Sequence, residues 1–515
     1  MKEEKTADRR WAVLAVLLAG MLMGGMDLTI LNVALPTVGR ELLPSGSELL
    51  WIVDGYALTV AATLVVCSTV GDRLGRKRVL LTGLATFGLA SAAGALSSAP
   101  GQLIAARAVQ GLGYSMMLSS TVVIIRVVFP VARERSLAYG LWVASSSTGA
   151  ALGPVLGGVL VEKFSWGAVF LVNVPIAVIA VLFGAALVPE SRNPEAPRWD
   201  VPSAVLSILG LAGAVYALQH IGQPERLSPA TVASGVLGVA LLIIFTLRQR
   251  RIPNPLLDIR LFTDRRFSVS TVAILCCYGA YTGLLFLLTQ QLQLVDGYSP
   301  AKAGLSLVPI AVASAVGGVL APKLASVVGN RWGVTAGMAV LALALIALSA
   351  AGAAGNYASL VAVGLGSGIV MTLGADSMMS AAPPERAAEA GAVQEVGFSL
   401  GAGLGVAAMG VIATVAYRGD LAPVEGLTSA QSDAAAGSLN TAVELAGKLS
   451  GPVGNALRTG AREAFRHGFS VTTATVAAVV LALAAVVAVL LRAGRPEAVA
   501  PAADDRPAAQ RSTAG

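Results

Sequence analysis

Long apolar runs, separated by short polar segments, follow one another along the chain from residue 12 to residue 491. A helix needs about 20 residues to cross roughly 30 Å of hydrocarbon, and these runs have that length. Fourteen runs qualify, and their approximate cores are residues 12–33, 50–70, 79–97, 102–125, 136–160, 168–188, 202–219, 229–247, 267–290, 303–327, 333–352, 358–378, 390–416 and 469–491. The pattern predicts an all-α polytopic membrane protein with 14 transmembrane helices.

Composition and charge agree with this prediction. Hydrophobic residues make up 55% of the 515 residues and charged residues 13%, too few charges to cover soluble domains. With the N-terminus inside, the inner segments hold 26 of the 36 Lys and Arg residues, and the short outer segments hold 4. Because cytoplasmic loops retain Lys and Arg, we expect both termini in the cytoplasm and the chain in the cell inner (plasma) membrane. The net charge of +7 then reflects this sidedness and does not indicate a nucleic-acid partner.

The sequence shows no motif of an enzyme or a cofactor site. We find no phosphate loop of the Walker type, no nucleophile elbow and no His/Cys cluster with metal spacing. The three cysteines, Cys67, Cys276 and Cys277, fall inside predicted spans, where disulfides are not expected. We therefore expect no enzyme activity, no cofactor and no metal. The energy must come from an ion gradient, and protons are favoured because no sodium-site signature is recognisable.

A faint internal repeat relates the first six predicted spans to the last six. Gly111-Leu112-Gly113 recurs as Gly364-Leu365-Gly366, and GAALGPVLGG (149–158) recurs as GAGLGVAAMG (401–410). Chance similarity of Gly/Ala-rich helices is the alternative to duplication. Two six-helix halves in parallel repeat are the layout of transporters that rock around a substrate held between the halves.

This layout predicts four regions of the chain. Residues 1–190 form the N-terminal six-helix bundle, and residues 191–255 form an inserted two-helix hairpin with linkers. Residues 256–492 form the C-terminal bundle, with a long extracellular loop at 418–468 in which a short amphipathic helix is expected near 436–450. Residues 493–515 are expected to be a disordered cytoplasmic tail.

Glycine and proline collect in the fifth predicted span. Gly149, Gly153 and Gly157 stand four apart on one helix face, where small residues let membrane helices approach closely. Pro154 removes one backbone hydrogen bond and bends the helix. The span is thus predicted to be a bent, closely packed interface, although ordinary helix packing is the alternative for a single G-x-x-x-G.

Five motifs carry a family resemblance. The first is the complete glycine pattern of the fifth span, and four others are MDLTILNVALP (26–36), GDRLGRKR (71–78), RAVQGLG (107–113) and GYSPAKAGL (297–305). The glycine pattern consists of Gly140, Gly149, Gly153, Pro154, Gly157 and Gly158. It resembles the antiporter motif of the major facilitator superfamily, and the other four resemble motifs of its fourteen-span drug/proton antiporters. The departures are Met26, where the first-span motif has leucine, and Ser68, where the loop motif usually begins with glycine. The resemblance implies the major facilitator fold, with two six-helix bundles plus the inserted hairpin.

The loop motif between the second and third spans has its own physical rationale. A tight turn at Gly75 presents Arg73 and Arg76, which can pair with Asp72 or with a helix end of the neighbouring half. Such pairs would latch one conformation of the transporter. For the following Lys77-Arg78, positive charge on the cytoplasmic side is the simpler alternative.

Four ionisable residues lie inside predicted spans, where each is costly and is a functional candidate: Asp27, Asp54, Arg107 and Glu395. At about 1.5 Å per residue the first three lie at one depth in the outer half. Glu395 lies nearer the cytoplasmic side, and a different start of its helix would place it deeper. We hypothesise that Asp27 and Arg107 pair or exchange partners, which would switch the proton affinity of the carboxylate. Proton coupling is assigned to Asp27, Arg107 and Glu395. The resemblance implies this role for the acid at the position of Asp27, and it matches Glu395 to an acid of the family's span 13.

Candidate substrate-binding residues are Asp27, Asp54, Glu395 and Gln290. Three of them have simpler alternatives. Asp54 would serve as an interfacial helix cap, Glu395 as a structural hydrogen-bond partner between helices, and Gln290 as a polar helix end.

We predict a proton-coupled antiporter that exports amphipathic, cationic or aromatic drugs or antibiotics by alternating access, as a monomer in the lipid bilayer. Some cation exporters of the family have further acids where this chain has Ser314 and Ser399, which argues against dicationic substrates. Export of an endogenous metabolite, a self-made antibiotic or a siderophore is the alternative within transport. A membrane sensor without transport is the alternative from another class.

Overall fold

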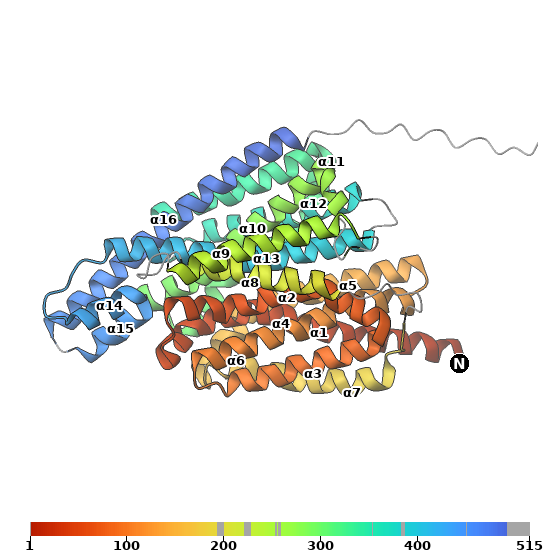
Figure 1. The fold of residues 1–515 in the computed structure, drawn as a ribbon, viewed down its shortest axis with the longest axis horizontal. Helices are drawn as coiled ribbons and strands as arrows, with labels where there is room; N and C mark the ends of the chain where they lie inside the picture. Colours follow the sequence, from red (N-terminus) through yellow and green to blue (C-terminus); the bar gives the residue numbers. More distant parts are fainter. Residues whose placement is uncertain are drawn as a thin grey trace, which may run out of the picture.

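The computed structural model describes residues 2–192, 200–220, 228–252, 255, 259–352, 354–382, 387–449 and 451–491, and within these ranges every regular element is helical (Figure 1). The helices of the N-terminal half are α1 (Lys2–Leu42), α2 (Gly46–Leu74), α3 (Arg76–Ala95), α4 (Pro100–Val128), α5 (Ala132–Lys163), α6 (Ala168–Leu171) and α7 (Asn173–Leu187). A pair, α8 (Val201–His220) and α9 (Pro229–Gln249), follows. The remaining helices, which include the C-terminal half, are η1 (Ile259–Thr263), α10 (Arg265–Gln290), η2 (Gln291–Val295), α11 (Pro300–Ala351), α12 (Tyr357–Ala381), α13 (Ala387–Asp420), α14 (Ser429–Gly437), α15 (Leu439–Lys448) and α16 (Pro452–Leu490). The predicted tail, 493–515, lies outside the described residues.

Helix lengths match the predicted spans. Within the described ranges, 13 helices are long and apolar enough to cross a membrane. One of them, α11, covers two predicted spans, because the chain passes from one helix to the next at Gly329 with φ 79° and ψ 157°. Dividing α11 at this glycine gives the fourteen spans expected from the sequence.

The internal repeat is visible as equivalent helix contacts. A Cβ added at Gly111 of α4 would lie 2.5 Å from the carbonyl oxygen of Tyr56 in α2, and one at Gly364 of α12 would overlap that of Ile310 in α11. Likewise, the backbone at Gly149 approaches Leu22 of α1, and that at Gly401 of α13 approaches Leu275 of α10. Each contact recurs about 253 residues later in the chain. Equivalent glycines thus hold equivalent helix pairs together in the two halves.

The helices α8 and α9 form a hairpin inside the segment 191–255, and α8 contacts α2 and α13, one helix from each half. Glycines let the two helices approach closely, since a Cβ at Gly238 would lie 2.5 Å from Ala214 N. At the base of the hairpin, Arg248 pairs with Asp200 at 2.8 Å, and Gln249 Nε2 donates to Ser203 Oγ at 2.7 Å. The hairpin is therefore a closed unit with a polar base.

The segment expected as a long loop, 418–468, contains more regular structure than the sequence indicated. The expected amphipathic helix is present as α15, but α14 precedes it, and α16 begins at Pro452 rather than near residue 469. Tyr417 Oη donates to Ala435 O at 3.0 Å, and Arg418 Nε donates to Ala436 O at 3.0 Å, which ties α14 to the end of α13. The segment is a small helical cap that Figure 1 shows beyond one end of the helix bundles.

Candidate functional site

A buried ion pair lies inside the N-terminal half. Asp27 of α1 is 0% exposed and Arg107 of α4 is 2% exposed, and Arg107 Nη1 donates to Asp27 Oδ2. Arg107 also donates from Nε to Ile52 O at 3.1 Å, and its guanidinium lies 4.6 Å from the ring centre of Tyr56. The structure thus places the two residues in the expected pair, and their role in proton coupling stays a prediction.

Neutral polar side chains complete the surroundings of this pair. Gln110 Nε2 and Asn173 Nδ2 donate to Asp27 Oδ1 at 3.3 and 3.2 Å. Gln110 also accepts from Arg107 Nη1 at 3.1 Å and donates to Ser91 Oγ at 2.8 Å. Gln110, Asn173 and Ser91 are 0% exposed, and none of them was predicted from the sequence. The available signal was their polarity inside apolar helices.

Asp54 is also fully buried, 0% exposed, in the third turn of α2. Its complete burial does not fit the alternative of an interfacial cap. The capping residue of α2 is instead Ser45, which forms a capping box with Glu48. Substrate binding by Asp54 stays a prediction.

Glu395 and a group of aromatic rings meet between the halves. Glu395 of α13 is partly exposed and interacts electrostatically with Tyr114 of α4 and with Tyr278 of α10. Tyr278 packs on Phe398 at 5.1 Å and on Tyr281 at 6.1 Å between ring centres. Since Tyr114 and Tyr278 lie near the middle of their helices, Glu395 sits deeper than the sequence suggested.

On the N-terminal side of this group, Tyr114 lies 5.8 Å from Tyr56 between ring centres. Gly24 of α1 makes room for Tyr114, because a Cβ there would overlap its ring. The carboxylate and rings together, Glu395, Tyr56, Tyr114, Tyr278, Tyr281 and Phe398, are called the acid–aromatic group below. Such a group suits a flat organic cation, which gains from both ring faces and a carboxylate.

Arg76, just after α2, makes its side-chain contacts within the N-terminal half. Arg76 is 3% exposed, pairs with Asp72 and donates from Nη1 to Ser119 O at 3.0 Å. Gly75 has φ 109°, in the region that favours glycine, and Arg73 lies in the last turn of α2. The tight turn that the sequence predicted is therefore present.

An acid that the sequence did not indicate contacts the residues that follow Gly75. Glu190, which follows α7, accepts from Lys77 N at 3.1 Å, and its carboxylate lies 3.7 Å from Arg78 Nε. A Cβ at Gly75 would overlap the same carboxylate. Glu190 belongs to the N-terminal half, so these contacts do not reach the neighbouring half. A latch between the halves stays a prediction.

The glycines of the α5 motif make two kinds of contact, and one of these glycines makes none. Gly149 and Gly153 pack on α1, where a Cβ would overlap Leu22 O and Thr29 Oγ1, respectively. Gly158 packs on the C-terminal half, where a Cβ would lie 2.6 Å from Pro300 O. Gly140 faces open space, with no atom within 4 Å of a Cβ. One motif therefore serves both the inside of a half and the seam between halves.

The remaining motif positions follow the same division. A Cβ at Gly157 would lie 2.8 Å from Ile30 O of α1. Pro154, inside α5, turns its carbonyl oxygen toward Gly304 of α11, where a Cβ would overlap it. Pro154 and Gly158 thus contact the C-terminal half from neighbouring turns of α5.

We call the end of the molecule where α1 finishes and α2 begins the far side; it is the end that carries α14 and α15. The halves are joined there by Gln293 Nε2, which donates to Val33 O at 2.8 Å, and by Ala301 N, which donates to Glu162 Oε2 at 3.1 Å. Toward the opposite end, the near side, a Cβ at Gly391 or Gly397 of α13 would meet no atom within 4 Å. The described contacts thus close the far side more tightly than the near side.

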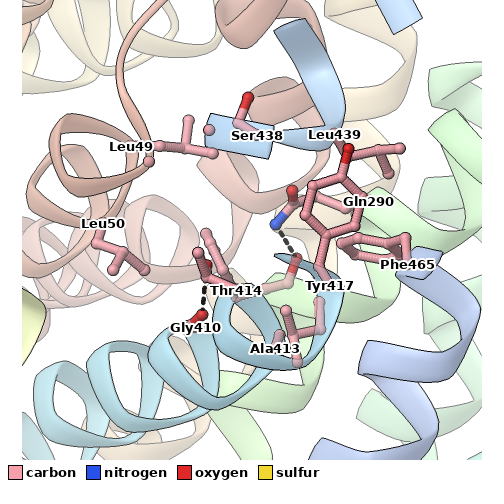
Figure 2. A pocket seen from close by; sticks show the side chains of 14 residues that line it. Leu49, Leu50, Gln290, Gly410, Ala413, Thr414, Tyr417, Ser438, Leu439 and Phe465 are labelled. Carbon is pink, nitrogen blue, oxygen red and sulfur yellow. Dashed lines mark hydrogen bonds between the residues drawn. The ribbon is translucent and has the colours of Figure 1, made fainter. Parts of the chain in front are cut away.

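A small cavity of about 50 Å³ remains on the far side, between α2, α10, α13 and the helical cap (Figure 2). Gln290 lines it beside Tyr417 and donates from Nε2 to Phe286 O at 3.4 Å. Sites for drug-sized ligands are about 300–1,000 Å³, so this cavity is too small for one. Gln290 therefore lies in the far-side closure in this structure, and a role in substrate binding stays a prediction.

Sequence comparison relates the chain to a known family and to proteins of similar length. The sequence model of the Major Facilitator Superfamily matches residues 17–406. The multidrug efflux pump LfrA of Mycolicibacterium smegmatis is 38% identical over 492 residues, covering 95% of this chain and 97% of LfrA. The methyl viologen resistance protein SmvA of Salmonella typhimurium is 34% identical, covering 92% of this chain and 97% of SmvA.

Among solved structures, the chain resembles a bacterial homologue of the human lysosomal transporter Spinster, in an inward-facing and unoccupied conformation. The TM-score is 0.68 at 16% identity, and the match covers 93% of this chain and 97% of the other. This likeness concerns the fold.

Proposed function

The chain belongs to the major facilitator superfamily, and from this membership we propose that it is a proton-coupled antiporter exporting amphipathic, cationic or aromatic drugs by alternating access. Membership makes it a multi-pass membrane transporter rather than an enzyme, and its relatives are drug efflux pumps. The proposal adds the coupling ion, the direction of transport, a cytoplasmic location for both termini and function as a monomer.

One observation carries the proposal: the protein keeps two acids in separate and different surroundings. Asp27 is sealed inside the N-terminal half against Arg107, whereas Glu395 lies partly exposed between the halves among aromatic rings. A buried acid with a counter-ion suits reversible protonation, and a carboxylate beside rings suits an organic cation. Proton and drug can thus occupy different sites of one molecule.

The closed far side is consistent with a drug that enters the transporter from the cytoplasm. Lys and Arg are concentrated in the segments on the near side, which favours a cytoplasmic location for that side. The structure then represents a state closed to the outside, in which a drug reaches Glu395 from the cytoplasm. Protonation of Asp27 from outside and release of the drug there would complete the exchange.

Reconstituted transport tests the proposal. Purified protein in liposomes should move the fluorescent cation ethidium toward the side with the higher proton concentration, and reversing the pH difference should reverse the movement. A protonophore should abolish net accumulation. Ethidium movement at equal rates with and without a pH difference, in either direction, would show that protons do not drive this transporter.

Replacing Glu395 tests the drug site. Glu395→Gln keeps size and polarity but removes the charge beside Tyr114 and Tyr278, so ethidium should bind about tenfold more weakly, a loss of about 1.4 kcal/mol. Nile red, an uncharged aromatic dye, should bind within about twofold of wild type because the rings remain. Fluorescence titration of purified protein measures both.

Glu425→Gln, at an exposed position before α14, is the matched control and should leave both affinities unchanged. Equal losses for ethidium and Nile red in Glu395→Gln would assign Glu395 to structure rather than to cation binding. Methyl viologen, a dication, extends the same titration. With one carboxylate in the acid–aromatic group, we expect it to bind more weakly than ethidium.

A further inference from the structure

In the side-chain amide of Asn173, the nitrogen makes hydrogen bonds and the oxygen makes none. Asn173 is fully buried at the first residue of α7, and its Nδ2 donates to Asp27 Oδ1 at 3.2 Å and to Ser91 Oγ at 3.5 Å. Its Oδ1 has no hydrogen-bond partner in the structure. A buried acceptor left unpaired is destabilising, which points to a second state in which the atom is used.

The ionised form of Asp27 is fully provided with donors. Arg107 donates to Oδ2, and Gln110 and Asn173 donate to Oδ1. A proton added at Oδ1 would face two amide donors, and an O–H group needs an acceptor. Gln110 already uses its oxygen to accept from Arg107, so the unused acceptor beside Oδ1 is that of Asn173.

We propose that Asn173 is a positioning residue for proton coupling: its amide donates to ionised Asp27 and, after a half-turn of the amide group, accepts from protonated Asp27. The inference rests on the proposed function. The proton stays on Asp27 throughout, and Asn173 exchanges hydrogen bonds only. The terminal torsion of asparagine is broad and roughly two-fold, so the half-turn meets little intrinsic resistance.

The surroundings allow both orientations. The Ser91 hydroxyl can donate or accept, so it tolerates either end of the amide. One polar atom of Asn173 is unpaired before the half-turn, and one is unpaired after it. The two arrangements are therefore close in free energy, and the protonation state of Asp27 selects between them.

Other groups face Asp27 from the helices packed around it. Arg107 approaches from α4, and Tyr56 from α2 interacts electrostatically with Asp27 and also with Tyr114 and Tyr278. From α5, Ala150 contributes a backbone carbonyl that accepts from Thr29 Oγ1 at 2.9 Å. If Asp27 is protonated, Arg107 keeps its bonds to Ile52 and Gln110 and its place over the Tyr56 ring, so it remains held.

Three side chains with the same number of non-hydrogen atoms separate a switching role from a structural one. Asparagine can donate and accept, Asn173→Asp introduces a second acid that shares a proton with Asp27, and Asn173→Leu can do neither. Asn173→Leu removes a charge-assisted bond to the ionised carboxylate and a weaker neutral bond to the protonated one, so the pH midpoint of ethidium transport should rise by about one unit, a tenfold change in proton affinity. Asn173→Asp should raise it further, because two adjacent carboxyl groups resist losing both protons.

Ethidium transport by the full chain in liposomes, measured over a pH series, provides the midpoints. Thr472→Val is the control, since Thr472 is a fully buried polar residue of α16, bonded to Gly468 O at 2.7 Å, and its loss should leave the midpoint unchanged. Infrared difference spectra provide a readout independent of transport. The carboxylic C=O band of protonated Asp27, identified by its absence in Asp27→Asn, should move to higher frequency in Asn173→Leu.

Two outcomes would overturn the inference. One is a wild-type midpoint in both Asn173 variants with only the rate reduced, and the other is an unchanged infrared band in Asn173→Leu. If Asn173→Leu fails to reach the membrane, the polar Asn173→Asp variant still tests the order of the midpoints. Proton-driven transport that persists in Asp27→Asn would instead place the coupling proton on another residue. Wild-type transport that does not depend on the pH difference would remove the proposed function itself.

Discussion

Asp27→Asn should abolish the accumulation of ethidium against its gradient. One proton moving down a pH difference of about 1.7 units supplies about 2.3 kcal/mol, enough for roughly fifty-fold accumulation of a monovalent cation in one-for-one exchange, and asparagine cannot carry that proton. We expect the accumulation ratio in energised liposomes to fall to one, while downhill ethidium movement continues. Ethidium binding should remain within about threefold of wild type, since Glu395 and its rings are intact.

The same substitution should lower stability. Arg107 would lose its buried counter-ion, and breaking a buried pair by removing one partner costs about 3–5 kcal/mol. Its bonds to Ile52 and Gln110 and its position over Tyr56 reduce this cost, so we expect folded protein in detergent with a lower melting temperature.

Asp376→Asn is the matched control for Asp27→Asn. Asp376 lies in α12 but is exposed and accepts from Asn330 Nδ2 at 2.6 Å, so its replacement should change neither accumulation nor melting. Undiminished accumulation in Asp27→Asn would show that another residue carries the coupling proton and would contradict its assignment to Asp27.

Charged residues inside apolar helices were the most informative part of the sequence for this site. Asp27 and Arg107 stand out because an unpaired charge in hydrocarbon is so costly that a partner at similar depth is expected. Gln110 and Asn173 could not be found in this way. A neutral amide costs less to bury, and its partner depends on how α4 and α7 are rotated, which hydropathy does not specify.

The helices themselves were predictable where apolar runs are long. The far-side cap was not, because α14 is rich in Ala and Ser, and α16 starts with 17 residues that read as a polar loop before residue 469. The depth of Glu395 stayed open in the sequence for a related reason. The polar sequence AAEAGAVQE at the start of α13 is helical, and hydropathy alone could not show this.

Close backbone contacts help to close the far side, beside a buried apolar cluster to which both halves contribute there. In a bilayer, lipid tails are as apolar as leucine, so helices associate through close packing of small residues and through hydrogen bonds. The seam uses both, with Gly158 and Gly304 beside the bonds of Gln293 and Ala301. Such contacts are weak individually and can be broken and remade during each cycle.

Gly158→Val should therefore open the far side. A valine side chain cannot fit between Gly158 and Pro300, where even a Cβ would lie 2.6 Å from the carbonyl oxygen and 2.7 Å from Ala301 Cα. Overpacking of about 2–3 kcal/mol, confined to the closed state, would shift the equilibrium roughly 30- to 150-fold toward outward opening. Ethidium transport should fall by a similar factor, and the protein should remain folded because the halves themselves are unchanged.

Cysteine labelling measures this shift. With the three native cysteines replaced by serine, Leu50→Cys places a thiol at a residue that is 5% exposed and lines the far-side cavity. A membrane-impermeant maleimide should react with it at least tenfold faster in Gly158→Val than in the parent, an effect of about 1.4 kcal/mol or more. Gly304→Val, which meets the carbonyl oxygen of Pro154 from the other half, should reproduce the result.

Two further glycines show whether position in the seam is what matters. Gly149→Val disturbs the contact of α5 with α1 inside the N-terminal half, so it should lower the melting temperature and leave the labelling rate of folded protein unchanged. Gly101→Val, at a residue with no atom within 4 Å of a Cβ, should change neither. If Gly158→Val instead behaves like Gly149→Val, with melting lowered and labelling unchanged, Gly158 belongs to the packing of its own half. The seam would then have to be held by Gln293, Glu162 and the helical cap.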